Sequence, residues 1–423
     1  MTRLAILGGG IMGACAALAA QNEGHEVTLI EPAAPGGAQA ASYGNGCWLS
    51  PASVVPPALP GLWRKLPRFL RDPLGPLAIR WARLPAAAPW LARYLAAGWT
   101  EPRVQRTAHA LRALLHDAPA LHAALAAEAG HPELIERHGL LTVFPDRAAF
   151  EAEALAWRVR AATGVRWLEL DAAELRQRVP ELDRRYGFGL LVEDGGHCRD
   201  PGAHVAGLVA LAESRGLRRV AARAEGFALD GPRGAARLRA VRTDRGEVEA
   251  EGAIICAGIH SARLAAAAGD RIPLESERGY HALLTDPEVQ PRIPLMPSDG
   301  KMGVTLTAGG LRAAGQVEIA GLEAAPDWRR AEILRDHLLR LFPGLPRDLP
   351  AGRVKVWMGH RPSTPDGLPV LGRSRASPDI LHGFGHGHVG LAAAPRSALL
   401  LMDLLASRPP GIPAAPYDPR RFG

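Results

Sequence analysis

Three glycines near the start of the chain have the spacing of a nucleotide-binding loop. Gly8, Gly10 and Gly13 form the pattern G-x-G-x-x-G between the apolar residues 4–7 and an alanine-rich segment. Such glycines allow a tight turn, close approach of the backbone to a pyrophosphate, and contact between a helix and a strand. The N-terminus of the following helix favours the negative charge of phosphates. Glu31 follows a second apolar segment, where its carboxylate can accept hydrogen bonds from ribose hydroxyls.

The elements that must position these residues are a strand, a turn, a helix and a second strand over residues 4–31. The alternative is a secretory signal peptide, which needs a basic start, an apolar core and a small-residue cleavage site. Arg3, the apolar run and Ala17-Leu18-Ala19 imitate these features, but the glycines interrupt the apolar helix that a signal peptide needs. The sequence therefore favours a dinucleotide-binding fold.

Length and composition indicate an ordinary globular protein. A chain of 423 residues, 47% apolar and 22% charged, can form two domains or one domain with an elaborate insertion. No stretch of about eighteen apolar residues free of charge or glycine occurs, so no membrane span is expected. The net charge of +7 is modest and nucleic-acid-binding motifs are absent, so no nucleic-acid partner is expected. No metal-type spacing relates the four cysteines, which predicts a cytoplasmic protein without disulfides or a metal site; they are Cys15, Cys47, Cys198 and Cys256.

The segment at 51–99 is rich in proline, tryptophan and arginine. Nine prolines between Pro51 and Pro89 exclude continuous helix over most of it. Two interpretations stay open. The segment is either a loop packed over a neighbouring domain, or a surface that makes peripheral contact with an anionic membrane on its inner face. The residues concerned are Trp63, Trp81, Trp90 and Trp99, with Arg64, Lys65, Arg68, Arg71, Arg80 and Arg83.

Apolar periodicity and turn residues predict the remaining elements. Helices are expected at about 103–130, 147–163, 171–180, 201–215, from the turn at Ala257-Gly258 to residue 269, 328–341 and 394–406, the last with Pro395 in its first turn. Extended segments are expected at 139–146, 217–229, 236–249, 251–256, 272–284 and 303–320. A small-residue turn at Ala257-Gly258 follows the strand at 251–256, and a glycine-histidine loop spans 383–390.

Three groups of motifs carry a resemblance that covers essentially the whole chain. They are "SYGNGCWLSP" (42–51) followed by "DPLGPLAIR" (72–80), "PLESERGYH" (273–281), and "WMGHRPSTPDGLPVLG" (357–372) with "GFGHGHVGLAAAP" (383–395). Together with the distance between the first nucleotide-binding unit and the strand at 251–256, they resemble the FAD-dependent family of D-amino acid oxidase, glycine oxidase and sarcosine oxidase. Within that family the motifs are most similar to those of bacterial D-amino acid dehydrogenases.

The resemblance implies a mixed α/β fold of two interleaved domains. A Rossmann-like FAD-binding domain is expected to comprise residues 1–50, 190–265 and 355–423. A lid and a substrate domain, built from a β-sheet and helices, are expected at 51–189 and 266–354.

The resemblance also implies where FAD binds, without a metal. Asn45, Gly46 and Cys47 match positions beside the isoalloxazine ring, and the cofactor is expected to be bound noncovalently. The N–H groups of the loop at 386–391 can stabilise negative charge on the reduced flavin. The residues expected to contact FAD are Gly8, Gly10, Ile11, Met12, Gly13, Glu31, Ser42, Asn45, Gly46, Cys47, Ala224, Ala257, Gly258, Gly385, His386, Gly387, Val389, Gly390 and Leu391.

Three residues are expected to be catalytic: Arg361, Tyr280 and His388. Arg361 matches the arginine that holds the substrate carboxylate, and a guanidinium fits a carboxylate through two parallel hydrogen bonds. Tyr280 and His281 are adjacent on a strand, so only one can face the substrate, and Tyr280 is the one expected to do so. His388 either faces the substrate or fills the loop, and Glu318 either lines the pocket or merely ends a strand.

These roles imply oxidative deamination of a D-amino or imino acid. After the ammonium loses a proton, hydride leaves Cα for flavin N5, the imine hydrolyses to a 2-oxo acid, and a quinone or other carrier takes the electrons. No catalytic dyad is evident in the motifs, which agrees with a reaction that depends on positioning. The D configuration rests on the resemblance alone. The alternatives are an oxygen-using oxidase of glycine, sarcosine or proline type, and a non-catalytic flavin-binding subunit of a larger complex.

Overall fold

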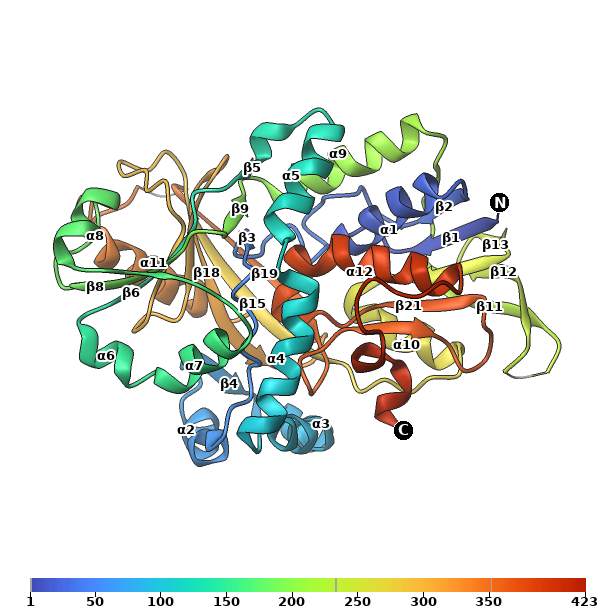
Figure 1. Cartoon of the computed structure of the whole chain (residues 1–423), viewed down its shortest axis with the longest axis horizontal. Helices are drawn as coiled ribbons and strands as arrows, with labels where there is room; N and C mark the ends of the chain where they lie inside the picture. The colour runs from blue at the N-terminus through green and yellow to red at the C-terminus, as the bar shows by residue number, and fades with distance from the viewer. Residues whose placement is uncertain (1, 233, 351) are drawn as a thin grey trace.

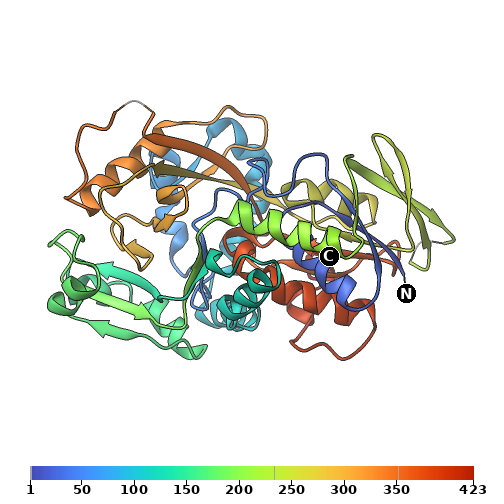
Figure 2. The same cartoon turned by 90° about the horizontal axis from the view of Figure 1, so that it is seen from above.

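The computed structural model describes residues 2–232, 234–350 and 352–423 and shows two lobes side by side (Figure 1). The lobe on the right of Figure 1 contains a six-stranded sheet and the N-terminus, and the other contains a nine-stranded sheet. Seen from above, the two lobes remain distinct (Figure 2). The mixed α/β fold expected from the sequence is confirmed.

The six-stranded sheet brings together segments that are far apart in the chain. Its order is β10-β2-β1-β14-β21-β20, and only the β20–β21 pair is antiparallel. Parallel strands end at the same edge of a sheet, so the turns after β1, β14 and β21 meet there. The strands are β1 (Arg3–Leu7), β2 (Glu26–Ile30), β10 (Arg218–Val220), β14 (Gly252–Ile255), β20 (Val370–Arg373) and β21 (Ile380–Phe384).

Alternate residues of β1 pack on opposite faces of this sheet. Leu4 and Ile6 contact a helical layer, whereas Ala5 and Leu7 contact an antiparallel three-stranded sheet and one helix. The helical layer comprises α1 (Ile11–Asn22), α4 (Glu101–Leu115), α5 (Ala118–Glu128), α9 (Pro201–Ser214) and α12 (Gly390–Leu405). The second face is covered by β11 (Ala224–Asp230), β12 (Arg237–Thr243), β13 (Gly246–Glu249) and α10 (Ser261–Ala267).

The second lobe is built on a sheet of order β19-β15-β18-β17-β16-β6-β8-β7, with β4 paired to the end of β18. Leucines of α11 (Arg329–Leu341) cover one face of its central strands. The strands are β4 (Leu77–Ile79), β6 (Leu140–Phe144), β7 (Leu168–Leu170), β8 (Phe188–Val192), β15 (Glu275–Leu284), β16 (Leu295–Pro297), β17 (Gly303–Thr307), β18 (Gly310–Ile319) and β19 (Val354–Ser363). The remaining strands and α-helices are β3 (Trp48–Leu49), β5 (Ile135–Glu136), β9 (Gly196–Cys198), α2 (Leu66–Arg71), α3 (Leu84–Ala97), α6 (Arg147–Glu151), α7 (Ala154–Ala162) and α8 (Ala172–Arg178).

The chain passes from one lobe to the other at positions that differ from the domain boundaries expected from the sequence. Segments 1–50, 190–265 and 355–423 supply all six strands of the first sheet. However, β8 extends to Val192 and β19 spans Val354–Ser363, and both pair within the nine-stranded sheet. The helices α4 and α5 also pack against α12 in the helical layer of the first lobe, although they belong to the expected lid segment.

The segment at 51–99 contains short helices as far as Arg83 and then the longer α3, which has Pro89 in its interior. Trp90 is buried and donates from Nε1 to the carbonyl oxygen of Ser363 at 3.1 Å. Trp63, Trp81 and Trp99 are exposed. This segment therefore contributes to the core of the protein and also presents aromatic side chains at its surface.

Helix α12 begins at Gly390, earlier than the sequence predicted, so Pro395 lies in its interior and not in its first turn. Proline has no N–H to give to the carbonyl four residues before it, which is that of Leu391. His122 of α5 donates from Nε2 to this carbonyl oxygen at 2.8 Å. Among the described residues, the segment Gly387–Leu405 is long and apolar enough to cross a membrane by length and composition, but here it packs in the helical layer.

Candidate active site

Backbone contacts explain the glycines of the first loop. Gly8 has a φ of +113°, and a Cβ there would lie 2.5 Å from the carbonyl oxygen of Cys256 at the end of β14. A Cβ on Gly13 would lie 1.8 Å from the carbonyl oxygen of Gly8. Because both obstacles are backbone atoms, no side chain can move aside to make room. These glycines hold β1, β14 and α1 in close contact around the turn.

The N-terminus of α1 and the carboxylate of Glu31 both border this turn. Gly10 provides no capping side chain, and the first turn, with Ile11 and Met12, contains no acid. Ser42 Oγ lies 3.2 Å from the backbone nitrogen of Ile11, and the N–H of Gly9 donates to Glu31 Oε2 at 2.7 Å. Anions bind at helix N-termini, and carboxylate oxygens keep further lone pairs for hydroxyl groups. These residues fit the pyrophosphate and ribose of a dinucleotide.

The turns after β14 and β21 complete this edge of the sheet. Ala257 Cα lies 2.9 Å from the position of a Cβ on Gly8, so the Ala257-Gly258 turn borders the glycine loop. Gly385 and Gly387 have φ values of +85° and +52°. From there the loop continues through His386, His388 and Val389 into α12, which begins with Gly390 and Leu391.

Two expected cofactor residues have other contacts. Ala224 begins β11, where its carbonyl oxygen accepts from Arg263 Nη2 at 3.2 Å, and it makes no hydrogen bond to the glycine loop within the described ranges. His386 is buried and its Nε2 lies 3.0 Å from Ser397 Oγ of α12. Burial lowers the pKa of His386 to about 4, so the ring is neutral and holds the loop against the helix.

The loop at 42–48 is a tight turn closed by Asn45. Its Oδ1 accepts from the N–H of Cys47 at 2.6 Å, and its Nδ2 donates to the carbonyl oxygen of Ser42 at 2.9 Å. Thr305 Oγ1 donates to the carbonyl oxygen of Gly46 at 2.9 Å. Burial raises the pKa of the Cys47 thiol, against the opposing effect of Arg312. The thiol therefore stays protonated at neutral pH, which does not favour covalent attachment of a cofactor.

The guanidinium of Arg361, on β19, is held by backbone carbonyls. Its Nη1 donates to the carbonyl oxygens of Gln316 at 2.9 Å and Arg278 at 3.5 Å, and its Nη2 donates to that of Gly315 at 3.3 Å. These bonds use three of its five N–H groups, and within the described ranges no ion pair of 4.0 Å or less joins it to a carboxylate. Burial lowers the pKa of Arg361, and the charge of the nearby Glu277 opposes this effect. Arg361 is therefore fixed in place with donors left for an anion that the protein does not supply.

A bulge in β18 and a glycine in β15 create this arrangement. The pairing of β15 with β18 shifts between Arg278 and Tyr280, and Gln316 at the shift has a φ of +61°. Such a bulge re-aims backbone groups, and here the carbonyl of Gln316 points at Arg361. A Cβ on Gly279 would lie 2.3 Å from the Cζ of Arg361, so the guanidinium crosses β15 where the side chain is missing.

Next to Arg361 lies an acid–base cluster that the motifs did not reveal. Glu277 is buried, and its Oε2 accepts from Ser363 Oγ at 2.5 Å and from His388 Nε2 at 3.0 Å. Burial acts to raise the pKa of Glu277, but His388, Ser363 and Arg361 together outweigh it and hold that pKa below its usual value. Tyr94 of α3 is also buried near this carboxylate, and burial, with the charge of Glu277, raises its pKa.

The strand residue that shares a face with Arg361 is His281, not Tyr280. Tyr280 lies on the other face of β15, in the core under α11, and its hydroxyl donates to Glu318 Oε2 at 2.7 Å. His281 Nδ1 lies 3.0 Å from the carbonyl oxygen of Gly44, and its ring stacks on that of Trp357 at 5.4 Å. The structure thus brings Arg361 and His388 together and leaves Tyr280 and Glu318 behind the sheet. The alternation of side chains along a strand predicts that only one of Tyr280 and His281 faces the site. The pairing of β15 with β19 is needed to show that it is His281.

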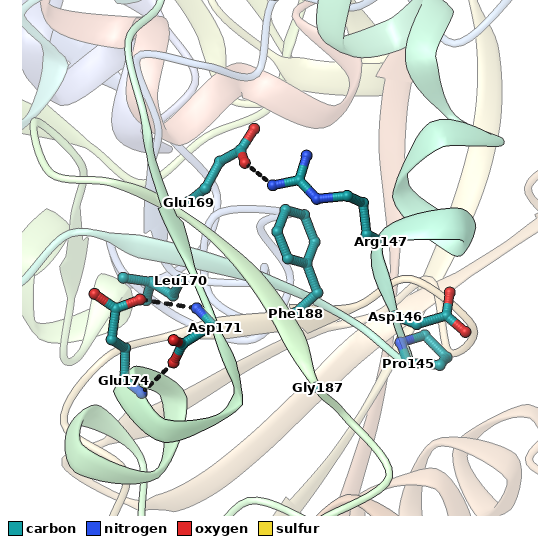
Figure 3. Close-up of a pocket in the computed structure, with 9 residues that line it drawn as sticks. All are labelled: Pro145, Asp146, Arg147, Glu169, Leu170, Asp171, Glu174, Gly187 and Phe188. Carbon is teal, nitrogen blue, oxygen red and sulfur yellow. Dashed lines mark hydrogen bonds and ion pairs between the residues drawn. The ribbon is translucent and has the colours of Figure 1, made fainter.

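Two pockets elsewhere on the protein contain none of the three residues predicted to be catalytic. One, of about 350 Å³, lies at the far edge of the nine-stranded sheet, where Arg147 pairs with Glu169 beside Phe188 (Figure 3). The other, of about 580 Å³, lies between residues 71–81 and 325–330. Its acidic residues, Glu318 and Asp327, are already paired with arginines. Neither pocket adjoins the glycine loops.

Known proteins resemble this chain over its whole length. The family model described as FAD dependent oxidoreductase matches residues 3–404. A protein of Bradyrhizobium diazoefficiens named D-amino-acid oxidase is 57% identical over 419 residues, covering 99% of this chain and 98% of that protein. D-amino acid dehydrogenase 2 of Ralstonia nicotianae is 32% identical over 430 residues, covering 98% and 99%. The structure of glycine oxidase from Geobacillus kaustophilus has a TM-score of 0.71 at 19% identity, covering 99% of this chain and 98% of that one. The chain therefore belongs to the family of FAD-dependent oxidoreductases, and FAD is its cofactor.

Proposed function

We propose that the protein oxidises a D-amino acid at Cα, giving a 2-oxo acid and ammonia after hydrolysis of the imine, or a cyclic imine from an imino acid. The observation that carries this proposal is Arg361, which is fixed by three carbonyl groups and has donors free but no carboxylate partner among the described residues. An amino acid supplies the missing carboxylate. The names of the relatives at 57% and 32% identity support the D configuration.

The residues of the site would bind the substrate and FAD and would provide positive charge near them. Two parallel hydrogen bonds from Arg361 would fix the carboxylate and hence the orientation of Cα. The glycine loop, Glu31 and the N-terminus of α1, where Gly10 adds no capping side chain, would hold the dinucleotide part of FAD. The start of α12, which has no side-chain cap, provides partial positive charge near the site. When bound, FAD supplies the acceptor for the hydride from Cα.

Molecular oxygen is the acceptor that the relatives favour. The protein of Bradyrhizobium diazoefficiens named an oxidase shares 57% of its residues with this chain, whereas the dehydrogenase of Ralstonia nicotianae shares 32%. A quinone or another carrier, which the sequence motifs suggested first, is the alternative. The two acceptors differ only after the flavin has been reduced.

One experiment tests both the oxidation of the amino acid and the identity of the electron acceptor. The FAD-loaded protein is mixed anaerobically with a panel of D- and L-amino acids while flavin absorption is followed, and oxygen is then admitted. The proposal predicts bleaching by D-amino acids, little bleaching by their L-enantiomers, and fast recovery of colour in oxygen. Slow recovery in oxygen with fast recovery on addition of a quinone would assign the alternative acceptor. No bleaching by any amino acid would overturn the proposal and favour a non-catalytic subunit.

For location, we propose a cytoplasmic protein whose 51–99 segment contacts the membrane surface. The exposed Trp63, Trp81 and Trp99 support this contact. Arg80 and Arg83 do not add to it, because they pair with Glu318 and Glu275, and the side chains of Lys65 and Arg68 lie outside the described residues. Sedimentation with anionic vesicles at low salt, reversed at high salt, is the expected result, and no binding at low salt would contradict it.

A further inference from the structure

We propose that His388 accepts a proton from the ammonium group of the substrate, and that Glu277, held by Ser363, is the positioning residue for this transfer. The inference rests on the proposed function, because it needs an amino acid bound at Arg361. It adds an acid–base pair to a reaction for which the sequence motifs suggested only positioning.

Hydrogen-bond geometry fixes the tautomer of His388. Its Nε2 lies 3.0 Å from Glu277 Oε2, and an ionised carboxylate oxygen can only accept a hydrogen bond. Nε2 must therefore carry the hydrogen, which leaves the lone pair of a neutral ring on Nδ1. Ser363 Oγ donates to the same carboxylate oxygen at 2.5 Å and fixes its position. Glu277 therefore orients the ring of His388, and Ser363 in turn holds the carboxylate of Glu277 in place.

Strand register places this pair beside the anchor for the carboxylate. Glu277 on β15 is the cross-strand partner of Arg361 on β19. Side chains directly opposite each other in an antiparallel pair have Cβ atoms about 5 Å apart. Ser363 also bridges to His386, which brings the loop that bears His388 onto the end of β19. Glu277 thus links the two groups, because it receives the hydrogen bond of His388 and its charge also interacts with that of Arg361. An amino acid whose carboxylate binds Arg361 would place its ammonium group on the side of the site where His388 lies.

The two members of the pair differ sharply in exposure. The Glu277 side chain is 3% exposed, whereas that of His388 is 42% exposed. The buried carboxylate stays ionised and balances the charge of an imidazolium, and the exposed ring can pass its proton to water. The other charged or titratable groups near the pair are Arg361 from β19 and Tyr94 from α3, while the neighbouring His386 is directed to Ser397.

Atoms and electrons balance in the step. The ammonium N–H bond breaks, its proton bonds to His388 Nδ1, and the electron pair stays on the substrate nitrogen. That lone pair then assists departure of hydride from Cα to the FAD cofactor, which is the oxidant, and the substrate becomes an imine. The imidazolium later releases its proton to solvent.

The test compares flavin reduction in His388→Gln, Glu277→Gln and the parent protein from about pH 5.5 to 9.5 by anaerobic rapid mixing. We expect reduction to slow at least roughly tenfold in His388→Gln, because general bases contribute about a hundredfold or more. Glu277→Gln should move the acid limb of the profile to lower pH, because the imidazolium loses its countercharge. His138→Gln is the matched control, since that ring also faces a glutamate, Glu136 at 3.4 Å, but on the surface.

Three further measurements separate a chemical role of His388 from a structural one. Added imidazole should restore reduction in His388→Ala, with the rate rising as the imidazole becomes neutral. FAD content and the spectral change on binding benzoate, which has a carboxylate but no ammonium group, should be unaltered in His388→Gln. Unchanged acid limbs in Glu277→Gln, or no rescue by imidazole, would overturn the inference. If the parent protein is reduced by no amino acid, the proposed function fails instead.

Discussion

The guanidinium of Arg361 crosses the neighbouring strand at Gly279, and the space for it exists only because that residue has no side chain. The sequence motifs could predict Arg361 because it stands in a long and specific signature. They could not predict Glu277 or Ser363, since a carboxylate and a hydroxyl group on two different strands become partners only through register. The one available signal was an acid in an otherwise strand-like segment, and such acids are common at strand ends.

Gly279→Ala should impair substrate binding without removing any charge. The new Cβ would lie 2.3 Å from the Cζ of Arg361 and displace the guanidinium from its carbonyl partners. Hydrogen bonds to charged groups are worth about 1.5–3 kcal/mol, so flavin reduction efficiency should fall roughly tenfold or more. The efficiency is measured by following anaerobic flavin reduction by a D-amino acid. Gly226→Ala is the control, because nothing lies within 4 Å of its Cβ position, and equal efficiencies in the two variants would contradict this description.

Helix α12 shows how one element depends on another. Its interior proline leaves the carbonyl of Leu391 without a helical donor, and His122 of α5 provides one. His204 of α9 lies 3.0 Å from His122 Nδ1 and completes a chain of two buried rings. The sequence predicted this helix with Pro395 in its first turn, but it placed the start of the helix at residue 394, whereas α12 begins at Gly390. The tertiary hydrogen bond that allows proline inside this helix was not visible in the local pattern.

The pairing of His122 with Leu391 predicts a measurable coupling with Pro395. His122→Phe should lower the free energy of unfolding by about 1–3 kcal/mol, because it leaves a buried carbonyl unpaired. In a Pro395→Ala background the loss should be smaller, since alanine has the backbone N–H donor that proline lacks. Urea denaturation of the four FAD-saturated proteins gives the coupling energy. Pro89→Ala in α3 serves as the control proline, and an equal coupling there would refute the assignment.

The molecule as a whole assembles its site from both lobes. The glycine turns come from the six-stranded sheet, whereas Arg361, Glu277 and His281 come from the nine-stranded sheet. The sequence indicated this interleaving because the motifs are long and occur in a fixed order. The expected boundary at 189/190 falls inside β8, and the one at 354/355 falls at the start of β19, although both strands pair in the nine-stranded sheet. Both strands lie next to segments of the other lobe, and their composition does not tell which sheet they join.

Buried neutral histidines should make the whole fold sensitive to acid. Burial lowers the pKa of His122, His281 and His386 to about 4 in each case. Between their ordinary pKa of about 6.5 and these values the unfolded chain binds more protons, so stability falls as pH falls. Three such groups together lower the free energy of unfolding by up to about 4 kcal/mol for each pH unit of acidification. The Tm of the FAD-saturated protein should therefore drop steeply from about pH 6.5 to about pH 5, and a flat Tm would contradict the burial of neutral rings.

The central claim is that Arg361 binds the carboxylate of an amino acid. The most direct measurement is anaerobic flavin reduction by a D-amino acid and by its amide, in the parent protein, Arg361→Ala and Arg361→Lys. The parent should prefer the acid strongly, because only the acid takes both charge-assisted hydrogen bonds. Arg361→Ala should lose at least about tenfold in efficiency with the acid and little with the amide, and lysine should restore only part of the loss. An Arg361→Ala variant that loses as much with the amide as with the acid would contradict the claim.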